Sequence, residues 1–330
     1  MFVALRDLRF AKGRFALMGV VVLLITLLVT MLSGLTAGLA QGNISGITGL
    51  PYERLVFAKT DKPAFADSRI TEAMWREHPG AQRLGITMGR VGGSAASLFG
   101  TESARQGSVL LSAELAENSG LKAGERVKIQ GKEFTVELSQ EESSYSHAPL
   151  AWISIGDWQE IAHQEPGTVA TVLGLPAGAA FTASADTTVV DLADAPSAIG
   201  SFTSENGSLQ LMRGFLFAIS ALVIGAFFTV WTIQRRGDVA VLKALGASTG
   251  YLLRDALAQA VIMLLIGAGL GGAIGAGAGA LAEGSVPFVL SAATMLVPVA
   301  VMILLGAAGA GLAIRKITSV DPLTALGAAR

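Results

Sequence analysis

The chain has 330 residues, of which 52% are hydrophobic and only 15% are charged, and its formal net charge is −1. It contains no cysteine, which excludes disulfide bonds and metal sites built from thiolates. Four long stretches contain no charged residue, and each supplies the roughly 20 apolar residues that a bilayer-spanning helix needs. The composition therefore indicates a membrane protein.

The N-terminal segment 1–14 is predicted to be a cytoplasmic amphipathic helix in the membrane interface, because its apolar and basic residues fall on different sides. The first span is expected at 15–40. This apolar run is longer than the 7–15 residues typical of a signal-peptide core, so we expect it to remain in the protein as a span.

Residues 41–205 are predicted to form an inserted α+β domain of short strands and helices. Alternation around Gln130 and Gly131 predicts a hairpin over 126–138. Two segments rich in Gly and Ser, 41–53 and 85–107, are expected to be loops. The other expected strands are 108–112, 150–155, 168–175 and 187–192, and the expected helices are 113–120, which ends at Gly120, and 157–163.

Three further spans follow the inserted domain. They are expected at 211–234, 254–282 and 288–314, joined by a cytoplasmic coupling loop or helix at 235–253 and an outer loop at 283–287, with a cytoplasmic tail at 315–330. The predicted fold class is an α-helical membrane protein with four transmembrane helices in a 1+3 layout and an inserted α+β extracytoplasmic domain.

The third span is rich in glycine. Small residues at every turn allow membrane helices to approach each other closely. Gly267, Gly269 and Gly272 also match the dinucleotide fingerprint G-x-G-x-x-G, which requires a preceding strand. Because the match lies inside a membrane span, we do not interpret it as a nucleotide site.

The charge distribution predicts the orientation. Residues 41–205 hold 12 Lys/Arg and 20 Asp/Glu, whereas the rest of the chain holds 12 Lys/Arg and 5 Asp/Glu. Most of the latter cations lie at the two termini and in the 235–254 loop, and short Lys/Arg-rich segments stay in the cytoplasm. We therefore expect a multi-pass protein of the cell membrane with both termini cytoplasmic and the inserted domain outside.

Sequence motifs for catalysis are missing. The chain has no P-loop, no nucleophile elbow and no metal-binding spacing. His78, His147 and His163 are far apart in sequence, and we interpret them as surface residues. The sequence argues against an enzyme.

Three local patterns resemble one family. They are QRRGDVAVLKALGAS at 234–248, VLLSAELAENSGLKAGERVKIQGKEFTV at 109–136 and VDPLTALG at 320–327. Together with the 1+3 layout, they resemble the FtsX/MacB-type permeases of ABC transporters. The resemblance implies a homodimer on a separate ATPase subunit, which binds the ATP and Mg²⁺, and it implies no intrinsic cofactor.

The cytoplasmic loop is amphipathic, and a solvated basic loop is the simplest interpretation. In the resembled family such a loop is the coupling helix that docks into a groove of the ATPase, a known recognition mode. The residues expected to couple are Arg235, Arg236, Val239, Leu242 and Leu245.

Within the family, the chain resembles the heme exporters of Gram-positive bacteria, where heme enters a site between spans one and two from the outer leaflet. Glu205, Met212 and Met31 are then the candidate ligands of the heme iron, since carboxylates and thioethers can serve as axial ligands. Arg213 is the candidate partner of a heme propionate. Phe215 and Phe217 are candidates to flank the porphyrin.

Each of these residues also has an ordinary interpretation. The methionines suit packing or lipid contact, Glu205 and Arg213 suit the membrane interface, and the phenylalanines suit an aromatic belt. The function also has alternatives: a mechanical transmitter that activates a cell-wall hydrolase, or an exporter of another amphipathic hydrophobe or of antimicrobial peptides. Heme and membrane lipid are expected partners, and nucleic acid is not.

Overall fold

The computed structural model describes residues 12–179, 184–234, 236–282 and 285–318. Its contacts divide the chain into a helical unit, Met1–Gly38 with Leu209–Arg330, and an inserted unit, Leu39–Ser208. Most of the amphipathic helix expected at 1–14 lies outside the described residues, as does most of the tail expected at 315–330.

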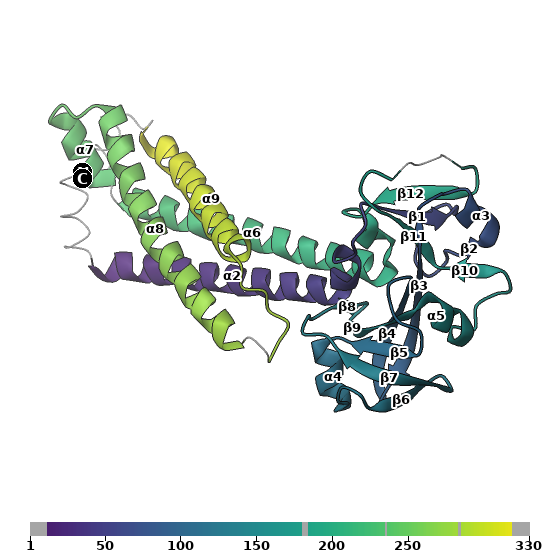
Figure 1. Ribbon diagram of the computed structural model, residues 1–330. Coiled ribbons are helices and arrows are strands. Elements are labelled where there is room, and N and C mark those ends of the chain that lie inside the picture. The colour runs from purple at the N-terminus through teal and green to yellow at the C-terminus, as the bar shows by residue number, and fades with distance from the viewer. Residues whose placement is uncertain (1–11, 180–183, 235, 283–284, 319–330) are drawn as a thin grey trace. The chain divides into compact units, whose positions relative to one another are not determined.

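Four long helices make up the helical unit and are coloured from purple to yellow in Figure 1. By length and hydropathy each of the four can cross a membrane. The predicted fold class is therefore confirmed: four candidate spans, with a mixed α/β domain between the first and the second. These helices are α2 (Lys12–Thr48), α6 (Gly200–Gln234), α8 (Thr249–Ala282) and α9 (Ala292–Thr318), with the short α7 (Arg236–Ala244) between α6 and α8.

The glycines of α8 form the close contact with α2 that the sequence predicts. A Cβ placed on Gly271 would lie 2.5 Å from the carbonyl oxygen of Leu23, and one on Gly275 would lie 2.4 Å from Oγ1 of Thr30. The two helices therefore touch through their backbones, as small residues at four-residue spacing allow. The dinucleotide-like match at Gly267 lies inside this helix and serves packing.

We expect the substitution Gly271→Leu to destabilise the helical unit. The added side chain must displace the backbone of α2, and overpacking of this kind costs about 1–3 kcal/mol or more. The matched control is Gly277→Leu in the same helix, where an added Cβ meets nothing within 4 Å. Thermal unfolding in detergent compares the two variants, and equal midpoints would contradict the close contact.

The inserted unit is built on a ten-stranded sheet in the order β12-β1-β11-β3-β4-β9-β5-β7-β6, with β8 paired to β9. The pairs β4–β9 and β5–β7 are parallel, and the other pairs of the sheet are antiparallel. A small second sheet pairs β10 with β2.

The bounds of the strands are β1 (Arg54–Ala58), β2 (Ile70–Thr71), β3 (Gln82–Val91), β4 (Ser94–Thr101), β5 (Ser108–Leu111), β6 (Arg126–Ile129), β7 (Lys132–Leu138), β8 (Ser144–Tyr145), β9 (Ala148–Ser154), β10 (Thr168–Ala170), β11 (Val172–Leu175) and β12 (Thr187–Asp191). The helical elements are α3 (Glu72–Arg76), α4 (Ala113–Ser119), α5 (Ile155–Ile161) and the 3₁₀ helix η1 (Ala195–Ala198).

Several predicted elements of this unit are confirmed. The hairpin β6–β7 turns at Gln130 and Gly131, both with positive φ, and α4 ends at Gly120 in the left-handed conformation. Helix α5 begins two residues before its expected start, because Ser154 caps it through the N–H of Asp157. The strand expected at 168–175 is divided into β10 and β11.

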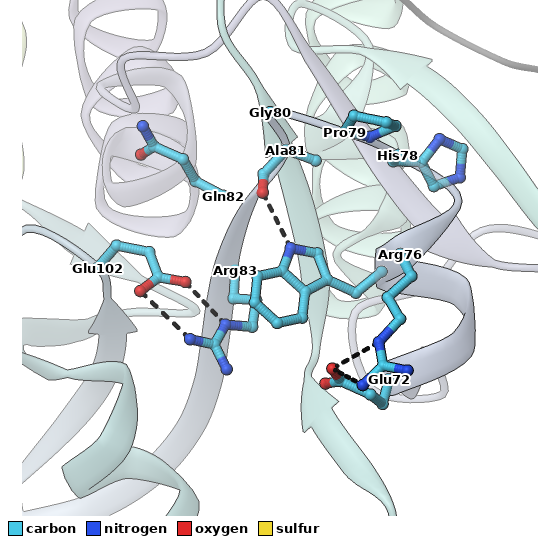
Figure 2. A pocket seen from close by; sticks show the side chains of 10 residues that line it. Glu72, Arg76, His78, Pro79, Gly80, Ala81, Gln82, Arg83 and Glu102 are labelled. Carbon is cyan, nitrogen blue, oxygen red and sulfur yellow. Dashed lines mark hydrogen bonds and ion pairs between the residues drawn. The ribbon is translucent and has the colours of Figure 1, made fainter.

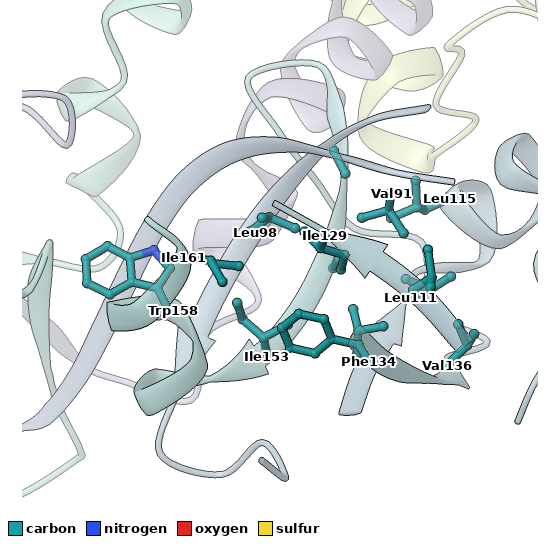
Figure 3. Close-up of a cluster of buried hydrophobic side chains, with 14 of the residues drawn as sticks. Val91, Leu98, Leu111, Leu115, Ile129, Phe134, Val136, Ile153, Trp158 and Ile161 are labelled. Atoms are coloured by element: carbon teal, nitrogen blue, oxygen red, sulfur yellow. The ribbon is translucent and has the colours of Figure 1, made fainter. Parts of the chain in front are cut away.

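The expectation of a loop at 85–107 is wrong, because this segment contains most of the hairpin β3–β4. Gly85 and Gly100 are paired across its two strands, and the indole of Trp158 occupies the space where their side chains would lie. Trp158 is fully buried in a cluster of apolar side chains from the sheet, α4 and α5 (Figure 3). These glycines are therefore packing residues of the sheet.

The expectation of a loop at 41–53 is also wrong for most of its length, because α2 continues to Thr48. Gly46 lies against Leu150 of β9, where a Cβ would come within 2.8 Å of Cδ1. Ile47 is fully buried in a second apolar cluster together with Leu150. Packing of this helical turn on β9 outweighs the low helix propensity of its glycines.

Candidate functional site

Glu205 lies in the second turn of α6, within the inserted unit. Its Oε2 atom is 2.7 Å from Nε2 of His147 and accepts a hydrogen bond of 3.2 Å from Nδ2 of Asn43. Oδ1 of Asn43 in turn accepts a hydrogen bond from the hydroxyl of Ser201. The carboxylate of α6, the imidazole of the β8–β9 hairpin and the amide of α2 therefore form a single polar cluster.

The cluster is accessible from outside. The side chains of Glu205 and His147 are 34% and 40% exposed, whereas Asn43 is almost fully buried. A ligand can therefore reach the carboxylate and the imidazole, while the amide beneath them holds the arrangement. The interpretation of His147 as a plain surface residue missed this pairing, and Asn43 was not singled out from the sequence.

The interpretation of His78 as a surface residue is wrong, because His78 is buried and its Nε2 lies 3.1 Å from Oγ1 of Thr187. Burial lowers the pKa of His78, and the neighbouring Glu77 opposes that shift. A buried, hydrogen-bonded histidine of this kind suits a structural role.

The other candidate heme-site residues lie in the helical unit. Met212 and Phe215 are exposed on α6, whereas Phe217 packs against the apolar core of the helices. Met31 on α2 is half-buried. Phe215 and Phe217 therefore occupy different surroundings, as expected for positions two apart on a helix.

Arg213 is half-buried, and its Nε atom is shielded from solvent without a hydrogen-bond partner among the described residues. A buried guanidinium N–H without an acceptor is costly.

Helix α7 occupies the cytoplasmic loop expected from the sequence. It ends in a Schellman motif, in which the N–H groups of Gly246 and Ala247 bond the carbonyls of Lys243 and Leu242. Leu242 and Leu245 are 37% and 80% exposed. Arg235 lies outside the described residues, and the side chains of Arg236 and Val239 are likewise not described.

The inserted unit also has a cleft of about 660 Å³, lined by residues around Trp75 (Figure 2). The guanidinium of Arg83 stacks on the Trp75 ring and pairs with Glu102 at 2.7 Å, and Arg76 pairs with Glu72 at 3.0 Å. These charged side chains form ion pairs with one another. We therefore assign the residues that line the cleft to the stability of the domain.

Asp157 is a fully buried carboxylate, and its partners explain its role. Burial alone raises the pKa of Asp157, but Lys132 at 2.6 Å and hydrogen bonds from Gly107 and Ser154 bring it below its usual value. The ion pair joins the start of α5 to β7. We assign it to the stability of the domain.

Groups of three or more His, Cys, Asp or Glu side chains that could hold a metal ion do not occur among the described residues.

Residues 211–322 match the FtsX-like permease C-terminal family. The matched region contains most of α6 and all of α7 and α8, and it reaches through α9, so this part of the chain is similar to the FtsX-like permeases.

The chain resembles a protein of Staphylococcus haemolyticus provisionally named as the hemin transport system permease protein HrtB, with 25% identity over 99% of both chains. A protein of the same name from Staphylococcus epidermidis is 30% identical over 41% of this chain and 38% of its own length. An uncharacterized ABC transporter permease of Mycobacterium bovis is 32% identical over 36% of this chain and 34% of its own length.

Proposed function

We propose that the chain is the permease subunit of an ABC-type efflux pump that expels heme from the outer leaflet of the membrane. The observation that carries this proposal is the similarity to the hemin transport permease over 99% of both chains, which includes the inserted domain as well as the spans. A separate ATPase subunit supplies the driving force, because the chain has no P-loop.

The proposed heme site is centred on Glu205. Its carboxylate is accessible and held by donors, and it is the first candidate to ligate the iron, followed by Met212 and Met31. Arg213 is the proposed partner of a propionate, which would supply the acceptor that its buried Nε atom lacks. Phe215, exposed on α6, is the proposed aromatic contact of the porphyrin.

The proposed assembly is a homodimer in the cell membrane of a Gram-positive bacterium, bound to an ATPase on the cytoplasmic side. The excess of Lys/Arg outside 41–205 supports cytoplasmic termini and an inserted domain outside. The exposed Leu242 of α7 and Leu245, which directly follows the helix, support docking of this segment in a groove of the ATPase.

A hemin titration of the full-length protein in detergent tests the proposal. We expect saturable binding with a shifted Soret band in the wild type. The variant Glu205→Ala should bind at least about 10-fold more weakly with an altered Soret band, because the iron loses a ligand. The matched control is Glu165→Ala, which removes an exposed carboxylate elsewhere in the inserted unit.

If hemin only partitions into the detergent micelles, without saturation and equally in all three proteins, the heme proposal is wrong. Saturable binding that Glu205→Ala leaves unchanged would preserve heme as substrate and move the site away from α6.

A further inference from the structure

The hairpin β8–β9 turns through only two residues, Ser146 and His147. Tyr145 pairs with Ala148 on either side of them, and their φ angles are 52° and 62°. Two positive φ values in a two-residue loop define a type I′ turn, for which Asn and Gly are the preferred residues. Neither position here is Asn or Gly. Ser146 and His147 therefore adopt a left-handed backbone conformation that is energetically unfavourable for residues with such side chains.

The strained turn forms two backbone hydrogen bonds with α2. The N–H of Ser146 donates to the carbonyl of Asn43 at 3.0 Å, and the N–H of His147 donates to the carbonyl of Gly42 at 3.1 Å. The turn therefore sits on the helix with a fixed backbone, and the imidazole of His147 is directed to the carboxylate of Glu205. A backbone outlier that places one polar side chain is a reason to assign that side chain a function.

The two contacts of Glu205 reach the same oxygen. Nε2 of His147 and Nδ2 of Asn43 both approach Oε2, at 2.7 Å and 3.2 Å. A carboxylate oxygen accepts hydrogen bonds, so this contact assigns the Nε2–H of the imidazole as the donor. Nε2 also lies 3.2 Å from Nδ2 of Asn43, which therefore donates to Oε2 and not to the ring. The amide is oriented independently, since its Oδ1 accepts from Ser201. Two donors thus hold one oxygen and leave the other, Oε1, for a ligand.

We propose that His147 and Asn43 are positioning residues that hold Glu205 through Oε2 so that Oε1 binds the iron of heme. This inference rests on the proposed function. The iron–oxygen bond forms with a lone pair of Oε1, while Oε2 keeps both of its hydrogen bonds and no proton has to leave. Carboxylates that ligate metals are characteristically oriented by hydrogen bonds of this kind, and loss of such a partner weakens metal binding about 10- to 100-fold.

The turn supplies a test that separates this role from folding. The variant His147→Gly removes the imidazole and relieves the strained φ, so the hairpin is preserved or stabilised. His163→Gly is the matched control, because it removes another exposed imidazole and relieves another positive φ, of 46°, away from the cluster in the same unit. His147→Asn is the rescue variant, since asparagine tolerates the left-handed conformation and retains an N–H donor.

Hemin titrations of these full-length proteins are read by the position of the Soret band and by the spin state of the ferric iron. We expect His147→Gly to raise the Kd about 10- to 100-fold and to shift the band, with His163→Gly unchanged and His147→Asn partly restored. The iron should be high-spin in the wild type, as suits a carboxylate oxygen.

If His147→Gly binds hemin with the same Kd and the same spectrum as the wild type, the positioning role is overturned, whereas the proposed heme site at Glu205 stays intact. A low-spin wild-type complex that becomes high-spin in His147→Gly would make His147 itself the ligand and would also overturn it. Absence of saturable binding in the wild type would overturn both this inference and the proposed function.

Discussion

The variant Leu242→Asp is expected to abolish stimulation of the proposed ATPase partner and to prevent its copurification with this chain. Leu242 lies on the exposed side of α7, and its carbonyl is held by the Schellman motif at the end of that helix. A carboxylate buried in an apolar groove without a partner costs several kcal/mol. A loss of about 2–4 kcal/mol corresponds to roughly a 30- to 1000-fold weaker complex.

The measurement is ATPase activity and pull-down in a reconstituted complex of the two subunits. Leu242→Met is the matched control, because it conserves volume and apolar character and is expected to behave as wild type. Thermal unfolding of the isolated permease should be the same for both variants, since the side chain is 37% exposed. Retention of the complex by Leu242→Asp would mean that α7 is not the coupling helix.

The variant Gly100→Val is expected to unfold the inserted unit or to lower its stability by about 3 kcal/mol or more. A Cβ on Gly100 would lie 2.4 Å from Cβ of the fully buried Trp158, and strand pairing prevents the backbone from moving away. Overpacking of a rigid core is destabilising for this reason. Ala95→Val in the exposed part of the same strand is the control.

Thermal unfolding followed by tryptophan fluorescence measures this effect. The double variant Gly85→Val with Trp158→Ala should be less destabilised than the sum of its single variants, because a Cβ on Gly85 would lie 2.2 Å from Cδ2 of Trp158, a ring atom that alanine removes. Additive effects would show that Gly85 and Trp158 do not share this space.

The spans could be predicted because charge-free runs of sufficient length have few alternatives, and α4 and the β6–β7 hairpin because their caps and turns are local. The hairpin β3–β4 could not, because its glycines oppose strand formation locally. Glycine is required at these two positions because Trp158, from a helix distant in sequence, occupies the space where their side chains would lie. In the same way α2 extends through Gly46 because Leu150 packs there.

The candidate site shows the same division. Glu205 was selected from the sequence by resemblance, but its partner His147 lies 58 positions away and only the tertiary fold brings the two together. A two-residue turn of Ser and His carries no Asn-Gly pattern that would indicate it. The heme-site roles of all six candidates stay predictions: Glu205, Met212, Met31, Arg213, Phe215 and Phe217.

The lengths of α2 and α6 constrain how this protein can vary. They have 37 and 35 residues, which at 1.5 Å per residue is more than 50 Å, against about 30 Å for the hydrocarbon core of a bilayer. Each runs unbroken from one unit into the other. One inserted residue would turn the far end of either helix by about 100°, whereas seven would restore its azimuth to within about 20°. Length changes in evolution should therefore fall in the loops of the inserted domain more readily than inside either of these helices.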